Sequence, residues 1–191
     1  GAMASSERVF ALLDTPVAIQ SKPEAASGAG SAGHIRFEHV TFGYVEGEPV
    51  LKDVSFEVRP GQRVALVGAT GSGKTTIINL LLRFYDVQAG RITVDGRDIR
   101  DIDLHELRAL CSLVLQDVHL FTGTIADNVR LGRAEIDTEA VRRAVEAVHA
   151  STFIDALPLG LETPVAERGA TLSVGQKQLL SLARALAFDR R

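Results

Sequence analysis

Residues 68–75 read Gly68-Ala69-Thr70-Gly71-Ser72-Gly73-Lys74-Thr75 and match the pattern G-x-x-x-x-G-K-[ST]. Glycines let backbone N–H groups curl toward one point without interference from a Cβ atom. A helix that begins near Gly73 would add its unpaired N–H donors and its positive dipole end at that point. Lys74 would supply a mobile cation for β- and γ-phosphates, and the Thr75 hydroxyl could ligate Mg²⁺. The stretch therefore predicts a phosphate-binding loop.

The segments on either side of this loop supply the context that a phosphate loop requires. Residues 64–67 form a compact apolar run without alternation, which is typical of a strand buried on both faces. Residues 75–84 carry apolar side chains at helical spacing, namely Ile77, Ile78, Leu81 and Leu82. The order strand, glycine loop and helix favours a phosphate loop over a glycine-rich turn with an incidental lysine.

Before the loop, apolar and polar residues alternate, which predicts antiparallel strands with one buried face. The alternating apolar residues are Ile35, Phe37, Val54, Phe56 and Val58. After the loop, a short strand with Ile92 and Val94 ends at the turn signal Asp95-Gly96. The apolar run 112–115 predicts a second buried strand, which ends at Gln116.

The chain beyond Gln116 is predicted to be mostly helical. Asp137 is expected to cap a helix with Val141, Ala144, Val145 and Val148 on one face. Ser173 is expected to cap a later helix with an apolar stripe of Leu179, Leu182, Ala183 and Leu186. Strands, a phosphate-loop unit and a helical block together imply an α/β core with an inserted or appended helical subdomain.

The N-terminal segment differs in composition from the rest. Gly1-Ala2-Met3 looks like the scar of a removed purification tag, and residues 7–13 form a short helical pattern. Residues 21–33 are mainly Ala, Gly, Ser and Pro, which predicts a flexible linker. We therefore expect three parts: a stub and linker in residues 1–33, an antiparallel β-subdomain with the phosphate-loop core in 34–116, and a helical subdomain in 117–191.

Charge and composition exclude several classes of protein. A net charge of −3 gives no basic face for nucleic acid, so no such partner is expected. The single cysteine, Cys111, excludes an internal disulfide and favours an inert core thiol. No run of about 18 apolar residues occurs, so the chain is not expected to span a membrane itself. The five histidines show no metal-binding spacing.

A second motif, Leu172-Ser173-Val174-Gly175-Gln176, stands at the start of the late helix. Ser173 with Gln176 three residues later is a capping box, so a purely structural interpretation is available. Beside a phosphate loop, a helix N-terminus with a serine hydroxyl and a glycine is also a second anion site, able to receive a γ-phosphate. The residues alone leave both interpretations open.

In order and together, these motifs resemble the ATP-binding cassette (ABC) family from Ile35 to the end of the chain. Residues 68–75 look like the Walker A motif, and residues 172–176 look like the signature motif. Phe42-Gly43-Tyr44 looks like the A-loop, and Leu115-Gln116-Asp117 looks like the Q-loop. The resemblance implies a P-loop NTPase core of the α/β class.

The resemblance also implies ATP and Mg²⁺ as cofactors. Lys74 and Gln116 would be catalytic, Thr75 and Gln116 would hold Mg²⁺, and the ring of Tyr44 would stack on adenine. Two such domains would sandwich ATP head to tail. The implied nucleotide-binding residues are Tyr44, Gly68, Ala69, Thr70, Gly71, Ser72, Gly73, Lys74, Thr75 and Thr76, with Ser173, Gly175 and Gln176 acting in trans.

Several segments resemble exporters in particular. Residues 120–125 and Asp127-Asn128 are similar to the exporter segment after the Q-loop, and Glu162-Thr163 with Glu167-Arg168-Gly169 resembles the X-loop. Ala166 and Val174 stand where the family usually has glycine. The resemblance implies a partner transmembrane domain, a second nucleotide-binding domain, and a place at the cytoplasmic face of the cell membrane. We expect the isolated fragment to be soluble.

One catalytic element of the family is not found. Hydrolysis requires a carboxylate carried as Asp-Glu after an apolar strand, and the sequence contains no Asp-Glu dipeptide. The resemblance places that strand directly after Ala187-Phe188-Asp189. We therefore expect the C-terminal part of the core sheet to be missing. The full-length parent would be an ABC-type ATPase, and this chain would bind ATP without hydrolysing it.

Two other interpretations are weighed against this one. The chain could be a non-catalytic module, such as the degenerate half of a heterodimeric transporter or a regulatory fragment, and Val174 favours a heterodimer. An unrelated P-loop kinase or GTPase does not explain residues 172–176, and the guanine-reading Asn-Lys-x-Asp of a GTPase is absent from the sequence.

Overall fold

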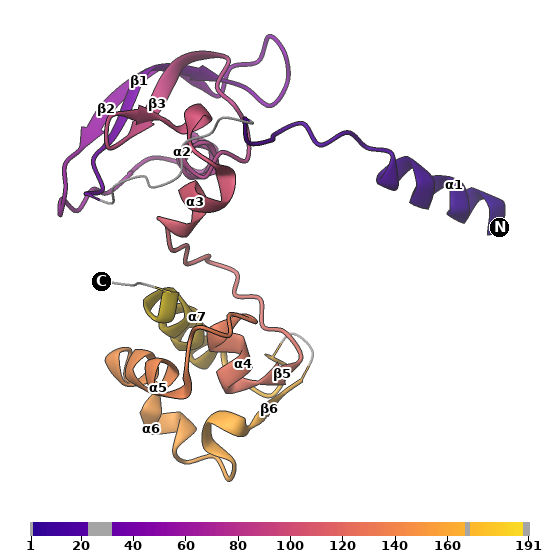
Figure 1. The fold of residues 1–191 in the computed structure, drawn as a ribbon, viewed down its shortest axis with the longest axis vertical. Helices are drawn as coiled ribbons and strands as arrows, with labels where there is room; N and C mark the ends of the chain where they lie inside the picture. The colour runs from indigo at the N-terminus through magenta and orange to yellow at the C-terminus, as the bar shows by residue number, and fades with distance from the viewer. Residues whose placement is uncertain (1, 23–31, 167–168, 189–191) are drawn as a thin grey trace. The chain divides into compact units, whose positions relative to one another are not determined.

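The computed structural model describes residues 2–22, 32–166 and 169–188, and the chain divides into two compact units (Figure 1). Unit 1 is Gly1–Cys111 and unit 2 is Ser112–Arg191. Unit 1 combines an antiparallel sheet with helices, and unit 2 is mainly helical, so the predicted α/β class is confirmed.

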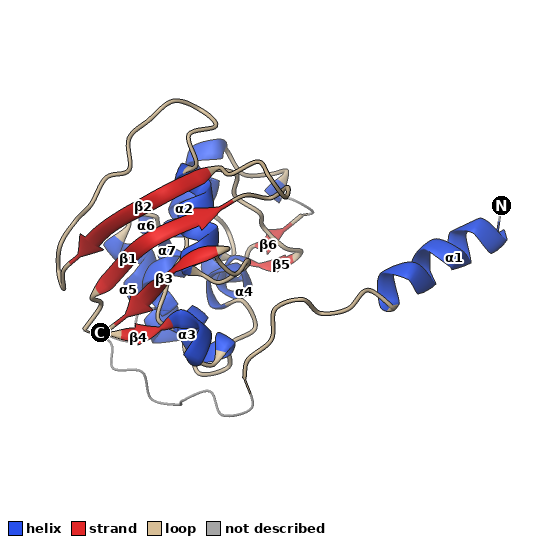
Figure 2. Ribbon diagram, turned by 90° about the horizontal axis from the view of Figure 1, so that it is seen from above, coloured by secondary structure: helices blue, strands red, loops and turns tan. Residues whose placement is uncertain are grey.

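Unit 1 is built on a four-stranded antiparallel sheet with the strand order β2-β1-β3-β4 (Figure 2). The strands are β1 (Ile35–Phe42), β2 (Leu51–Val58), β3 (Ala89–Val94) and β4 (Arg97–Asp98). At the β3–β4 turn, Asp95 and Gly96 have φ values of 50° and 80°, as a type I′ hairpin requires. The predicted antiparallel strands are confirmed.

A bulge in β1 keeps one face of the sheet apolar. Phe37 pairs with Phe56 in β2, and the register then shifts before the pair formed by Val40 and Val54. His39, inside the shift, has a φ of 50°. The extra residue moves the buried positions of β1 from odd to even numbers, so Phe37 and Val40 reach the same core.

The helices of unit 1 are α1 (Ala2–Leu13), α2 (Lys74–Leu81), the 3₁₀ turn η1 (Ile99–Asp101) and α3 (Leu104–Ala109). Helix α2 lies against one face of the sheet (Figure 2), and its Leu80 is fully buried beside sheet residues such as Phe37. The core cluster comprises Phe37, Val40, Phe42, Leu51, Leu80, Ile92, Val94, Ile99, Ile102 and Leu107.

Two buried strands predicted from apolar runs are wrong. Residues 64–67 and 112–115 have no strand assignment, and Val67 is 92% exposed. A strand that is buried on both faces needs hydrogen-bonding neighbours along its edges. No strand of the described chain pairs with either run, so neither run can form the predicted ladder.

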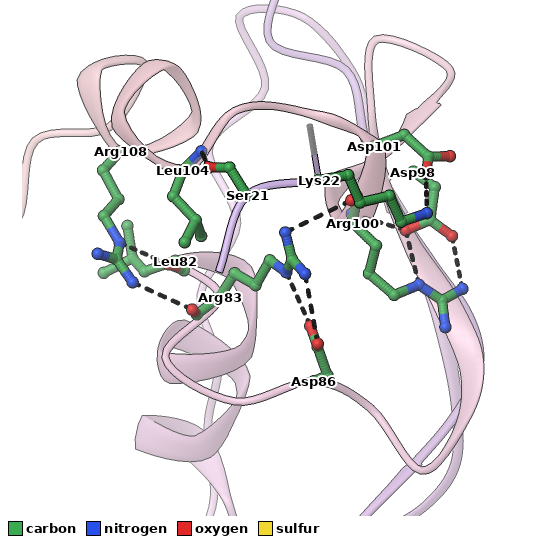
Figure 3. A network of polar contacts seen from close by, with 10 residues as sticks. All are labelled: Ser21, Lys22, Leu82, Arg83, Asp86, Asp98, Arg100, Asp101, Leu104 and Arg108. Atoms are coloured by element: carbon green, nitrogen blue, oxygen red, sulfur yellow. Dashed lines mark hydrogen bonds and ion pairs between the residues drawn. The ribbon is translucent and has the colours of Figure 1, made fainter. Parts of the chain in front are cut away.

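Two residues of the predicted linker have fixed partners in the structure (Figure 3). The Ser21 hydroxyl donates to Oδ2 of Asp103 at 2.8 Å. It accepts from the N–H of Leu104 at 2.9 Å, as Figure 3 shows. Lys22 forms an ion pair with Asp101. The hydrogen bond from Ser21 holds the pKa of Asp103 below its usual range. Residues 23–31 of the predicted linker lie outside the described part of the chain, so the flexible linker stays a prediction.

Unit 2 contains β5 (Gly123–Thr124), α4 (Ile125–Arg130), α5 (Thr138–Ala147), α6 (Ser151–Ile154), η2 (Gly160–Glu162), β6 (Pro164–Val165) and α7 (Val174–Phe188). β5 and β6 form a short antiparallel pair. The predicted cap of α5 is confirmed, because Asp137 accepts from the N–H of Ala140 at 2.7 Å. The predicted apolar face is also confirmed, since Val141, Ala144 and Val145 are buried.

The predicted apolar stripe of α7 is wrong in part. Leu180 and Ala183 have no exposed surface, whereas Leu182 and Leu186 are 42% and 45% exposed. Leu179 and Ala187 pack at the edge of the core around Leu180. Because α7 is apolar on more than one side, spacing alone does not select the side that faces α4 and α5.

Within residues 2–22, 32–166 and 169–188, no helix is long and apolar enough to cross a membrane. In the same ranges, no group of three or more His, Cys, Asp or Glu side chains is arranged to hold a metal ion.

Candidate functional site

The predicted phosphate loop directly precedes α2. Gly71 and Gly73 have φ values of 84° and 88°, which residues with a side chain rarely adopt. The N–H of Ser72 donates to the carbonyl of Ala69 at 3.2 Å and closes the tip of the loop. Gly73 is the N-cap of α2, and no side chain caps this helix. The first turn of α2 therefore presents backbone N–H groups that have no acceptor within the helix.

The ammonium group of Lys74 lies against this loop. Its Nζ atom donates to the carbonyls of Gly68 and Ala69, both at 2.8 Å, and lies 3.5 Å from the hydroxyl of Ser72. Thr75 is exposed at the next position. Backbone amides, an ammonium and a free hydroxyl fit a polyphosphate with its Mg²⁺. Residues 68–75 thus form one donor set.

Tyr44 is held against the side of α2. Its hydroxyl donates to Oγ1 of Thr76 at 3.2 Å and accepts from Nδ2 of Asn79 at 3.2 Å. The ring meets those of Phe42 and Tyr85 edge to face, with both centroid distances at 5.1 Å. Tyr44 remains 49% exposed. The structure therefore joins Tyr44 to the phosphate-loop helix and leaves part of it open to a planar ligand.

Sequence reasoning missed two residues next to Tyr44. Asn79 is one, and its signal was available: it is a polar residue in an apolar stretch, three positions after Thr76 on the same side of the helix. Gln88 is the other. Its side-chain amide accepts from the N–H of Gly43 at 2.9 Å and donates to the carbonyl of Gly43 at 3.0 Å. No local pattern connects Gln88 with a residue 45 positions earlier.

Gln116, the predicted Mg²⁺ ligand, lies in unit 2. It is exposed, in a segment without regular secondary structure. The phosphate loop belongs to unit 1, so a contact between Gln116 and the metal stays a prediction.

The signature-like motif forms the N-terminus of α7. The Ser173 hydroxyl accepts from the N–H of Gln176 at 3.2 Å, and Oε1 of Gln176 accepts from the N–H of Ser173 at 2.8 Å. The capping-box interpretation of this spacing is therefore confirmed. Ser173 and Gly175 are exposed, and Val174 is 73% exposed. An anion-binding role for this helix end stays a prediction.

The exporter-like segment after Gln116 is organised by Asn128. This side chain is 2% exposed and pairs with both the N–H and the carbonyl of Phe121 at 2.8 Å. Arg184 of α7 donates to the carbonyl of Asn128 at 2.9 Å, and burial lowers the pKa of Arg184. Phe121 is 60% exposed and, with Leu131, lines a cavity of about 360 Å³.

The X-loop-like residues are only partly described. Glu167 and Arg168 lie outside the described residues. Gly169 follows them with a φ of 65° and donates to the carbonyl of Ala166 at 2.8 Å.

Comparison with known proteins places this chain in a family. The family model described as ABC transporter matches residues 51–191. A Mycobacterium bovis protein named fatty acid ABC transporter ATP-binding/permease protein is 45% identical over 96% of this chain and 29% of the relative. The Bacillus subtilis protein named uncharacterized ABC transporter ATP-binding protein YknV is 49% identical over 98% of this chain and 31% of the relative.

A solved structure agrees with these matches. The structure of a bacterial Atm1-family ABC exporter with ATP bound matches with a TM-score of 0.89 and 39% sequence identity. The match covers 98% of this chain and 33% of that one. The chain thus spans about a third of the length of the proteins it matches. It belongs to the ABC transporter family, in which it corresponds to the ATP-binding domain of an exporter.

Proposed function

We propose that this domain binds Mg²⁺-ATP with the phosphates on residues 68–76 and the adenine on Tyr44. The observation that carries the proposal is the donor set at the start of α2, where the helix has no side-chain cap and the Lys74 ammonium lies against the loop. Thr75 would ligate Mg²⁺ through its hydroxyl. Tyr44 supports the base end, because it is half exposed and fixed to the same helix.

Titration of the chain with ATP tests this assignment. We expect saturable binding by isothermal titration calorimetry, weaker when EDTA removes Mg²⁺. Inorganic tripolyphosphate should compete with ATP, because it satisfies the same amides and the same ammonium. ATP binding that excess tripolyphosphate leaves unchanged would contradict a phosphate site in this loop.

We also propose that the chain as given binds ATP without hydrolysing it. The family's Asp-Glu pair does not occur in the sequence, and hydrolysis needs a carboxylate that orients the attacking water. A steady-state phosphate-release assay should therefore read background. If the unchanged chain released phosphate from ATP above background, and Lys74→Ala abolished that release, this part of the proposal would be overturned.

For the exporter as a whole, we propose that two such domains close head to tail on ATP at the cytoplasmic face of the membrane. Ser173, Gly175 and Gln176 of one chain would then meet the ATP on the phosphate loop of the other, with Gln116 near the metal. ATP binding and hydrolysis would drive the attached transmembrane domain. The cargo would be chosen by that membrane domain and not by this site.

The exposed side chain of Val174 favours a second candidate, the weaker half of a heterodimeric exporter. It stands where the family signature usually has glycine, at the first position of α7. Size-exclusion chromatography with light scattering separates the two candidates. A homodimer that forms with ATP supports self-pairing, whereas a monomer that dimerises only after Val174→Gly supports a different natural partner.

A further inference from the structure

We propose that Asn79 and Gln88 are positioning residues, which hold Tyr44 in the orientation that stacks on the adenine of ATP. The inference rests on the proposed ATP binding and extends it to two residues outside the phosphate loop. Neither residue would touch the phosphates. Both would act through Tyr44.

The first attachment is at the phenol hydroxyl. It lies between Oγ1 of Thr76 and Nδ2 of Asn79, each at 3.2 Å, so it is both donor and acceptor. Thr76 is 4% exposed. Rotation of the Tyr44 side chain away from α2 would break both bonds and leave the nearly buried Thr76 hydroxyl without this partner.

The second attachment is at the backbone before Tyr44. The Gln88 amide bonds both the N–H and the carbonyl of Gly43, as a neighbouring strand would. The main chain of Gln88 is itself fixed, because its N–H donates to the carbonyl of Thr41 at 3.1 Å. A Cβ on Gly43 would lie 2.2 Å from the carbonyl oxygen of Glu48, so only glycine fits beside that strand-like pairing.

The third attachment is the ring itself. Phe42 and Tyr85 both meet it nearly perpendicularly, with interplanar angles of 85° and 84°. Phe42 is 4% exposed and belongs to the core of unit 1. The ring is therefore tied to the core on one side, to α2 at its hydroxyl, and to Gln88 through its backbone.

These attachments connect the two ends of the nucleotide site. Helix α2 begins with Lys74 and Thr75 and carries Asn79 a turn and a half further along. A platform fixed to the phosphate-loop helix loses little freedom when the base stacks, and such preorganisation increases affinity. Loosening the platform should weaken ATP and leave binding of a bare polyphosphate unchanged.

The test compares ATP with inorganic tripolyphosphate on the full 191-residue chain. The variants are Asn79→Ala, Gln88→Ala and Tyr44→Phe, which keeps the ring and removes the hydroxyl. We expect the Kd for ATP to rise roughly 3- to 10-fold in each and the Kd for tripolyphosphate to stay unchanged. Tyr44→Phe combined with Asn79→Ala should cost no more than Tyr44→Phe alone, because removing the hydroxyl already removes the hydrogen bond to Asn79.

Gln178→Ala is the matched control, since Gln178 is an exposed glutamine on α7. It should bind both ligands as the unchanged chain does. An unchanged Kd for ATP in Asn79→Ala and Gln88→Ala would overturn the inference. An equal loss of ATP and tripolyphosphate would also overturn it, because that result indicates general damage to the fold.

A second measurement needs no nucleotide. The chain has two tyrosines and no tryptophan, so its near-ultraviolet circular dichroism near 275 nm reports mainly on Tyr44 and Tyr85. Both alanine variants should lose part of this signal while the far-ultraviolet spectrum stays unchanged. If the unchanged chain binds no ATP, the proposed function fails. A near-ultraviolet signal that neither variant alters would overturn the positioning role by itself.

Discussion

Helices α2 and α7 both carry predicted phosphate contacts, but they begin in different ways. Helix α2 starts at Gly73 in the left-handed region, with no side-chain cap. Helix α7 starts with the reciprocal pair Ser173 and Gln176. The N–H groups of α2 are open to a ligand, whereas an anion at α7 must share donors with the helix's own cap. We therefore expect α2 to be the primary anion site of a single chain.

The glycines at the two helix ends differ as well. Gly73 has a φ of 88°, and a Cβ there would lie 2.7 Å from Cδ2 of Leu51. Gly175 has an ordinary φ, and a Cβ there would meet no atom within 4 Å. The fold thus requires glycine at the start of α2 and merely permits it at the start of α7.

Replacing the lysine of α2 should give the largest effect. Lys74→Ala removes a cation with charge-assisted hydrogen bonds, so the free energy of ATP binding should weaken by about 3 kcal/mol, roughly 100-fold in Kd. Isothermal titration calorimetry measures the Kd of the variant for ATP. Lys52→Ala, at an exposed position of β2, is the control and should bind ATP normally. If Lys74→Ala and Lys52→Ala bound ATP with equal affinity, the start of α2 would not be the primary anion site.

The two glycines should respond unequally to alanine. Gly73→Ala should lower the free energy of unfolding by about 2–3 kcal/mol, because it combines left-handed strain with a contact to Leu51. Gly175→Ala should change it by less than about 1 kcal/mol, with a sign that favours the helix. Urea unfolding measures both. A similar loss at both positions would show that the helix starts have the same steric demands.

Removing the cap of α7 should affect stability and not ATP binding. Ser173→Ala should lower the free energy of unfolding by about 1 kcal/mol. The Kd of the isolated chain for ATP should remain unchanged, because α2 supplies the primary site. Ser173→Asp keeps a capping oxygen and should restore most of the stability. A single-chain ATP affinity that falls with Ser173→Ala would contradict the separation of the two helix ends.

Asp103 is the N-cap of α3, where its side chain accepts from the N–H groups of His105 and Glu106, and a change beside it should give the smallest effect. Ser21→Ala removes the hydrogen bond that contributes most to the lowered pKa of Asp103, so this pKa should rise toward its ordinary value of about 3.9. Because the pKa of Asp103 is lower in the folded chain than in the unfolded chain, its carboxylate stabilises the fold at pH values above the unfolded-state pKa. This contribution is lost as the pH falls through the folded-state pKa. NMR titration of the Asp103 carboxyl measures the shift. His105→Ala, which leaves Ser21 in place, should shift it less.

Local patterns predicted the parts of the molecule that local interactions form. The capping boxes and caps at Ser173 and Asp137 depend on residues three apart, and the structure confirms them. The apolar runs 64–67 and 112–115 failed as strands because a strand needs partners from elsewhere in the chain. The predicted apolar stripe of α7 was wrong in part, because several sides of that helix are apolar and spacing does not show which side is buried.

The sequence by itself determined the phosphate loop and the order of motifs, because glycine spacing, one lysine and a helix start lie within eight consecutive residues. Only the tertiary structure decided what surrounds Tyr44. Its hydroxyl meets Asn79 from 35 positions away, and Gln88 reaches Gly43 across 45. Ser21 meets Asp103 across 82 positions. Such contacts leave no periodic signal in a single chain, because folding and not spacing brings their residues together.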